Sequence, residues 1–172
     1  MNNSLSNKIT TLSPGEENSE HLSYHITPAR VPLFEVDLGQ AVYHGNYFHL
    51  FELGREDFLR RIGFPYRQFM ERQLHLTIVE ARCNYRRSIH YDEMIEIHTA
   101  IIKVRRRGLS FSQLLFRRNG QEEKNKESAG KELCTQVTLD MVCVTFSGRP
   151  TVLPEDFTKT IENKKITPAK GG

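Results

Sequence analysis

The sequence predicts an α+β domain in which one long amphipathic helix packs against an antiparallel sheet of about five strands. Two observations carry this prediction. Apolar residues recur at helical spacing between residues 47 and 62, and segments of strand character lie before and after that stretch. The strands after the helix can all pair antiparallel in chain order, and the broad apolar stripe of the helix needs a sheet face to cover it.

The first half of the predicted domain joins a strand to this helix. Residues 26–37 are expected to form the first strand, with an irregular course because two prolines interrupt it. The loop 38–46 carries two glycines and ends in Asn46, a favourable helix N-cap. The helix is expected over residues 47–62 and ends at Gly63, with a proline just beyond.

The second half of the predicted domain is mostly strand. One helical turn is expected near residues 66–71. Strands are expected over residues 74–86, 93–105, 109–118 and 133–146. Residues 119–131 are polar and charged and are expected to form an extended loop.

Composition indicates one globular domain between two tails. The 172 residues are 38% hydrophobic and 26% charged, which excludes a collagen-like chain and argues against disorder over most of the length. Residues 1–22 and 158–172 are expected to be flexible tails around a domain at 23–157. No apolar run is long enough to span a bilayer, and the first residues lack the apolar segment of a signal peptide, so the expected location is the cytoplasm.

Several kinds of site find no support in the sequence. The three cysteines are widely spaced, so we predict small buried side chains rather than disulfides or metal ligands. The histidines show no metal-like spacing, and the motifs of a phosphate-binding loop and of a nucleophile elbow do not occur. We therefore expect no metal and no cofactor. The net charge of +3 does not by itself imply a nucleic-acid partner, and none is expected.

The segment 37–47 concentrates groups that suit acyl transfer. Asp37 stands at a predicted strand end, and a glycine-containing loop follows. The start of the helix then offers free backbone N–H groups at the positive end of its dipole. A carboxylate that faces such an oxyanion site meets the needs of acyl transfer. The alternative is that Asp37 and Asn46 only cap and turn the chain.

A run of specific residue types continues from this segment through the helix. Its members are Asp37, Val42, Tyr43, His44, Asn46, Tyr47, Glu52 and Arg55. This run resembles the signature of the hotdog-fold acyl-CoA thioesterases, in particular the 4-hydroxybenzoyl-CoA thioesterase family and the Tol-Pal-associated bacterial thioesterases. The order of the later segments also fits, so the resemblance covers roughly residues 26–155. It implies a sheet wrapped around one central helix, and the hydrolysis of an acyl-CoA to free acid and CoA.

The resemblance implies a role for each residue of the site. Asp37 would attack the thioester carbonyl as a nucleophile or activate a water molecule, and an exposed aspartate is ionised at neutral pH for either role. The backbone N–H near His44 would polarise the thioester oxygen, and the His44 side chain would orient the substrate or assist proton transfer, with a structural role as the alternative. The other residues expected around the oxyanion and substrate pocket are Gly39, Gln40, Tyr43, Asn46 and Tyr47, with Tyr43 as a wall residue and Asn46 as a cap.

Two features bear on the substrate. Gln40 stands where the family usually carries a second small residue, often glycine, which leaves the acyl specificity open. The basic run of Arg105, Arg106 and Arg107 is expected to bind the CoA phosphates by charge-assisted hydrogen bonds. The alternative for this run is a solvated hairpin tip.

The resemblance also implies a partner. Hotdog thioesterases bury sheet surface against a second subunit and form their active sites at that interface, so a homodimer or homotetramer is expected. A monomer would leave a long open sheet edge, which proteins avoid. Two other functions stay open: another acyl-thioester enzyme of this fold, such as a dehydratase, and a non-catalytic acyl-CoA-binding or scaffold module.

Overall fold

The computed structural model describes residues 24–118 and 130–164. Its centre is a five-stranded sheet in the order β1-β3-β4-β5-β2, and every neighbouring pair is antiparallel. The strands are β1 His25–Arg30, β2 Leu74–Tyr85, β3 Met94–Arg105, β4 Gly108–Arg118 and β5 Lys131–Thr145. The predicted α+β class and the hotdog arrangement are confirmed. The predicted tail 1–22 and most of the predicted loop 119–131 lie outside the described residues.

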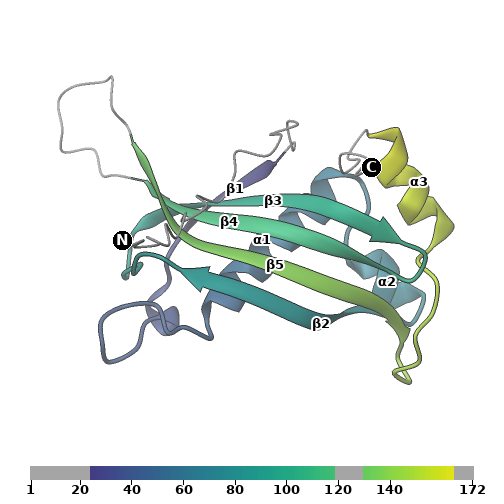
Figure 1. Cartoon of the computed structure of the whole chain (residues 1–172), viewed down its shortest axis with the longest axis horizontal. Coiled ribbons are helices and arrows are strands. Elements are labelled where there is room, and N and C mark those ends of the chain that lie inside the picture. Colours follow the sequence, from purple (N-terminus) through teal and green to yellow (C-terminus); the bar gives the residue numbers. More distant parts are fainter. Residues whose placement is uncertain (1–23, 119–129, 165–172) are drawn as a thin grey trace, which may run out of the picture.

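Helix α1 (Tyr47–Arg61) lies against one face of the sheet (Figure 1). Its buried residues Leu50, Phe51 and Phe58 join the core, which is the expected apolar stripe. The helix approaches the sheet most closely at Gly54, where an added Cβ would lie 2.5 Å from Cγ2 of Ile97. The helix therefore covers the sheet tightly enough that this position admits no side chain.

The first strand is shorter than the sequence predicts. Strand β1 ends at Arg30, and Pro32 then caps a short 3-10 helix, η1 (Leu33–Glu35). Proline cannot donate to a sheet ladder, so the strand gives way to a turn at this point. The chain instead forms an isolated bridge between Val36 and Val42. The result is a compact loop, rather than a strand end, around residue 37.

Two further helices close one end of the molecule. Helix α2 (Arg67–Glu71) matches the expected helical turn, and helix α3 covers Glu155–Asn163. The Phe157 ring of α3 lies 4.9 Å from the Phe64 ring and 5.0 Å from the Phe69 ring, measured between centroids. Ile161 is also buried. The expected start of a tail at residue 158 is therefore wrong, because α3 continues through it into the core.

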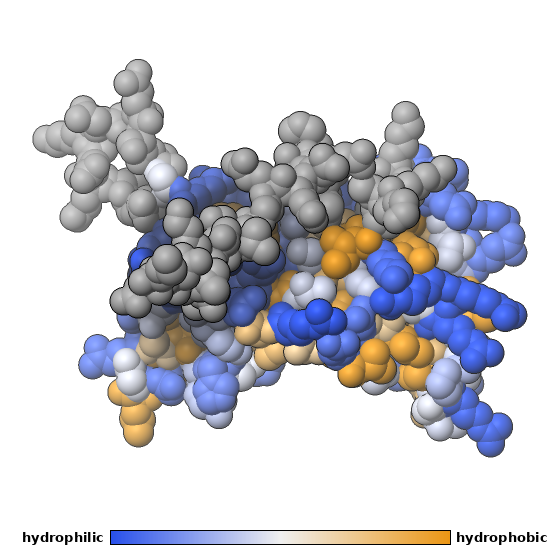
Figure 2. All heavy atoms as spheres, in the orientation of Figure 1, coloured by the Kyte–Doolittle hydropathy of each residue, from blue (hydrophilic) through white to orange (hydrophobic). Residues whose placement is uncertain are grey.

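Strand β2 forms a free edge of the sheet. Within the described residues it pairs with β5 alone, and all of its residues from Thr77 to Arg82 are exposed. A register shift between Ile78 and Glu80 marks a bulge, and Val79 is 62% exposed. Apolar residues also show between hydrophilic ones on the face of the molecule that Figure 2 presents. An edge of this length with apolar side chains is a ready surface for another strand.

Candidate active site

Asp37 lies in a tight turn that its own backbone and side chain stabilise. Its N–H donates to the Ala41 carbonyl over 3.0 Å, and its carbonyl accepts from Gln40 N over 3.0 Å. The Oδ1 atom of its carboxylate accepts a 2.7 Å hydrogen bond from Gly39 N. Asp37 itself is exposed. The carboxylate is thus held in one orientation while it stays open to a substrate.

Gln40 adopts an unusual backbone conformation in this turn. Its φ is 63°, in the left-handed region that favours glycine. A glycine, the residue expected here from the resemblance, would adopt this conformation freely, so the departure at Gln40 has a physical cost. A non-glycine residue held in this region stores strain of about 1 kcal/mol.

The loop is fixed to the end of the sheet. Val42 N donates to the Ile89 carbonyl over 2.8 Å, and Ala41 forms an isolated bridge with His90. These contacts anchor the return of the loop beside the segment that leads into β3. The Asp37 turn therefore projects from a rigid base.

The start of α1 supplies the donors of the expected oxyanion site. Within the described chain, the backbone N–H groups of His44, Gly45 and Tyr47 donate to no other backbone group. Asn46 is at the N-cap position, as expected, but its side chain makes no capping bond. Its Nδ2 donates instead to the Glu35 carbonyl over 3.1 Å. The expected capping role of Asn46 is therefore wrong, and its side chain ties the helix start to η1.

His44 lines an open hollow next to this helix start. The hollow contains about 540 Å³ of empty space, part of it open solvent. Its lining residues are Val42, His44, Tyr47, Tyr85, Arg86, Arg87 and Ser88. Of the residues expected in the site, His44 and Tyr47 lie here together, whereas Asp37, Gly39, Gln40, Tyr43 and Asn46 do not line it.

Tyr85 joins the hollow to the helix start. Its hydroxyl donates to the His44 carbonyl over 2.8 Å, and its ring packs edge-on against Tyr47 at 5.2 Å. Burial, with a contact to Cys83, raises the pKa of Tyr85 to about 12. The hydroxyl therefore stays protonated and able to donate across the physiological range. Tyr85 and Ser88 are absent from the expected site, although their place at the end of a predicted strand is the signal that could have included them.

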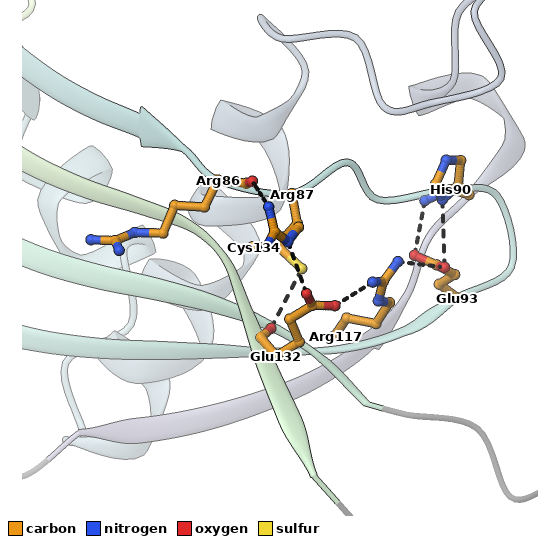
Figure 3. Close-up of polar contacts among 7 residues, drawn as sticks. All are labelled: Arg86, Arg87, His90, Glu93, Arg117, Glu132 and Cys134. Atoms are coloured by element: carbon orange, nitrogen blue, oxygen red, sulfur yellow. Dashed lines mark hydrogen bonds and ion pairs between the residues drawn. The ribbon is translucent and has the colours of Figure 1, made fainter.

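Arg87 belongs to a chain of ion pairs at the same end of the sheet (Figure 3). Its Nε lies 3.0 Å from Glu132, which also pairs with Arg117, and Arg117 reaches Glu93 at 3.2 Å. The hydrogen bonds from Arg117 and then Arg87 lower the pKa of Glu132. The Arg86 side chain points away from this chain of ion pairs in Figure 3. Its guanidinium has no ion pair with the described acidic residues.

The arginines expected to bind CoA lie at the other end of the sheet. Arg105 ends β3 and the other two arginines form the turn to β4, whereas the Asp37 loop lies beside the start of β3 (Figure 1). The 12 residues of β3 span roughly 40 Å, so one chain does not bring the two sets together. Arg105 is moreover 3.1 Å from Asp140. The hydrogen bond from Ser110 lowers the pKa of the Asp140 carboxyl most, and the contact with Arg105 lowers it further.

The described residues contain neither a candidate membrane-spanning helix nor a candidate metal-binding cluster. Within residues 24–118 and 130–164, no helix is long and apolar enough to cross a membrane. The same residues contain no group of three or more His, Cys, Asp or Glu side chains placed to hold a metal ion.

Known proteins share this fold and this sequence pattern. The model of the thioesterase-like superfamily matches residues 31–161. The chain belongs to the thioesterase-like superfamily. An acyl-CoA thioesterase named YbgC from Haemophilus influenzae is 30% identical over 91 residues, which are 52% of this chain and 67% of that protein. The acyl-CoA thioester hydrolase YbgC of Escherichia coli O6:H1 is 26% identical over 131 residues, 76% of this chain and 90% of the relative.

A solved structure supports the superfamily fold. The DHNA-CoA thioesterase of Staphylococcus aureus superposes with a TM-score of 0.71 at 24% identity, over 83% of this chain and 91% of that one. The match of the superfamily model runs from just before η1 into α3. It therefore includes the Asp37 turn, the start of α1 and most of α3, whose residues from 158 on were expected to be a tail.

Proposed function

We propose that this chain is an acyl-CoA thioesterase that hydrolyses the thioester of an acyl-CoA to free acid and CoA. The observation that carries the proposal is that one short segment, residues 37–47, contains both an oriented, exposed Asp37 carboxylate and the backbone N–H groups at the start of α1 that donate to no other backbone group of the described residues. The relatives named as acyl-CoA thioesterases support the same activity.

Two routes are chemically available to Asp37. As a nucleophile, its carboxylate adds to the thioester carbonyl and expels the CoA thiolate, and water then cleaves the resulting anhydride. As a general base, it takes a proton from the water molecule that adds to the carbonyl. In both routes the carbonyl oxygen becomes negative, and one backbone donor to such an oxygen contributes about 3 kcal/mol. We propose the backbone N–H groups of His44 and Gly45 as these donors, because they donate to no other backbone group of the described residues.

The remaining site residues shape the surroundings of the thioester. We propose that the His44 side chain, whose ring lies tilted against the Tyr43 ring at 4.1 Å between centroids, orients the substrate. Gly39 and Gln40 would form the turn that presents Asp37, while Tyr47 would line the substrate pocket. A thiolate is a good leaving group, so the mechanism does not depend on a strong general acid.

A homodimer would complete the site. If two β2 edges pair antiparallel, the Tyr85 end of one strand lies beside the Leu74 end of its partner. Leu74 pairs with Thr145, and the β3–β4 turn lies at that same end because Gly108 pairs with Val142. Such pairing would carry the partner's basic turn towards the Asp37 loop. The CoA-binding role of Arg106 and Arg107 is thus proposed across the interface, and light scattering of the purified chain tests it, since a monomer would contradict it.

An acyl-CoA panel tests the proposed function. The purified chain is incubated with short-chain, long-chain and aromatic acyl-CoAs while the released CoA thiol is measured. Saturable thiol release from at least one class supports hydrolysis. Binding of CoA without thiol release would instead indicate a non-catalytic module, and hydration of an enoyl-CoA would indicate a dehydratase. The cytoplasmic location expected from the sequence stays a prediction.

A further inference from the structure

Glu35 is a buried acidic residue that the proposed mechanism does not use. It ends η1, two residues before Asp37, and its side chain is 4% exposed. Its Oε2 atom accepts a hydrogen bond from Nδ1 of His49 over 3.0 Å. His49 lies in the first turn of α1, with its ring largely exposed. A buried carboxylate at this position therefore reaches directly into the helix start.

The backbone of Glu35 makes two more contacts to the same segment. Its carbonyl accepts from Tyr43 N over 3.0 Å and from Nδ2 of Asn46 over 3.1 Å. One residue thus bonds three points between Tyr43 and His49. That segment contains the free N–H groups of His44, Gly45 and Tyr47.

We propose that Glu35 and His49 are a positioning pair that sets the separation between the Asp37 carboxylate and the backbone donors at the start of α1. The proposal rests on the proposed function. Asp37 is covalently tied to Glu35 through one intervening residue, and the donors are tied to Glu35 through His49, Tyr43 and Asn46. Displacement of a reacting group by about 1 Å can reduce a rate about 100-fold, so this tie matters for the rate of the chemical step.

A second buried pair offers a matched control. Glu96 is also buried and accepts from His98 over 3.2 Å, and it pairs with Arg118 and Lys131 as well. Glu96 and His98 both lie in β3, and their basic partners lie in β4 and β5. None of these ion pairs involves the Asp37 turn or the start of α1. The loss of Glu96 should lower stability without a specific effect on the reaction.

The experiment compares Glu35→Ala, Glu35→Gln, His49→Ala and Glu96→Ala by kcat, KM and melting temperature. Glu35→Ala and His49→Ala are expected to lower kcat about tenfold or more with little change in KM. Glu35→Gln is expected to restore most of kcat, because its amide oxygen can still accept from His49. Glu96→Ala is expected to lower the melting temperature while the kcat of the folded protein stays unchanged. The double variant Glu35→Ala/His49→Ala should be no worse than the single ones.

Unchanged kcat in both Glu35→Ala and His49→Ala would overturn the proposal, as would equal losses of kcat in Glu35→Ala and Glu96→Ala. The wild-type chain is assayed first, so that absence of hydrolysis there counts against the proposed function alone. The rate of hydrogen exchange of the backbone amides at residues 43–49 then tests whether Glu35 holds the start of α1 in place. Faster exchange in Glu35→Ala than in Glu96→Ala supports the tie, and equal exchange overturns it.

Discussion

The hydroxyl of Tyr85 donates a 2.8 Å hydrogen bond to the backbone carbonyl of His44. This bond joins the last residue of β2 to the segment that enters α1. It fixes the wall of the hollow and the free N–H groups relative to each other. A strand at the free edge of the sheet therefore contributes directly to the geometry of the candidate site.

Removal of this hydroxyl should weaken the site more than the fold. Tyr85→Phe keeps the ring against Tyr47 and loses the bond to His44, so the free energy of unfolding should fall by about 1 kcal/mol. We expect kcat for acyl-CoA hydrolysis to fall severalfold. Because the pKa of Tyr85 is raised to about 12, the wild-type rate should show no loss from its ionisation between about pH 7 and pH 10.

Tyr91→Phe is the control for this prediction. Tyr91 is exposed and its hydroxyl makes no hydrogen bond within the described residues. The kcat and the melting temperature of the Tyr91→Phe variant should match those of the wild type. A Tyr85→Phe enzyme with the same kcat as Tyr91→Phe would show that the bond to His44 does not order the site.

Arg86 should contribute to substrate affinity. It lines the hollow beside His44, and the N–H groups of Arg86 and Arg87 both donate to the Cys134 carbonyl, which holds this backbone in place. Arg86→Gln is expected to raise KM for an acyl-CoA about fivefold, with kcat little changed, because a charge-assisted contact is lost. Arg67→Gln is the control, since Arg67 lies in α2 and pairs with Glu71. Equal KM values for the two variants would contradict a role for Arg86.

The Asp140 carboxylate should stabilise the fold in a pH-dependent way. Its pKa is lowered by the hydrogen bond from Ser110 and by Arg105, with burial opposing the shift. A lowered pKa contributes stability above the pKa of the unfolded state, about 3.9, and that stability is lost as the pH falls through the folded value. Asp140→Asn should therefore cost about 1 kcal/mol at pH 7 and progressively less below about pH 4. Denaturant unfolding at both pH values measures this, and a difference that persists at about pH 2 would contradict it.

Helix α3 should be part of the cooperative fold. Ile161→Ala removes a side chain that is 2% exposed, so the free energy of unfolding should fall by about 2–4 kcal/mol. Lys159→Ala in the same helix removes an exposed ion pair with Glu155 and should leave the free energy of unfolding nearly unchanged. Chemical denaturation compares the two. Similar small effects would indicate that α3 is only loosely attached.

Local patterns in the sequence were enough to predict most of the fold. The helical stripe through Phe51 and Phe58 and the alternation of Ile95 and Ile97 predicted the helix and a strand that buries one face, and all four side chains are buried. The prediction failed where a segment of mostly polar composition is held in the fold by a few buried side chains. Residues 158–163 are polar enough to resemble a tail, yet Ile161 packs into the core of the described domain.

The site was only partly predictable for the same reason. Asp37 and the helix start follow from a short segment, and the structure holds both at one end of the sheet. The contributions of Glu35, Tyr85 and Arg86 depend on contacts between segments far apart in the sequence. The sequence assigned the basic run at Arg107 to CoA binding, but a linear pattern does not show that β3 carries this run to the opposite end of the sheet from Asp37.

The most direct test is the hydrolysis of acyl-CoA by the wild-type chain and by Asp37→Asn. The amide keeps the size of the side chain but can neither attack the carbonyl nor accept a proton from water. With equal folding by circular dichroism and equal affinity for CoA, we predict that kcat falls by at least about 100-fold. Release of CoA thiol at the wild-type rate by Asp37→Asn would contradict the central claim that this carboxylate carries the reaction.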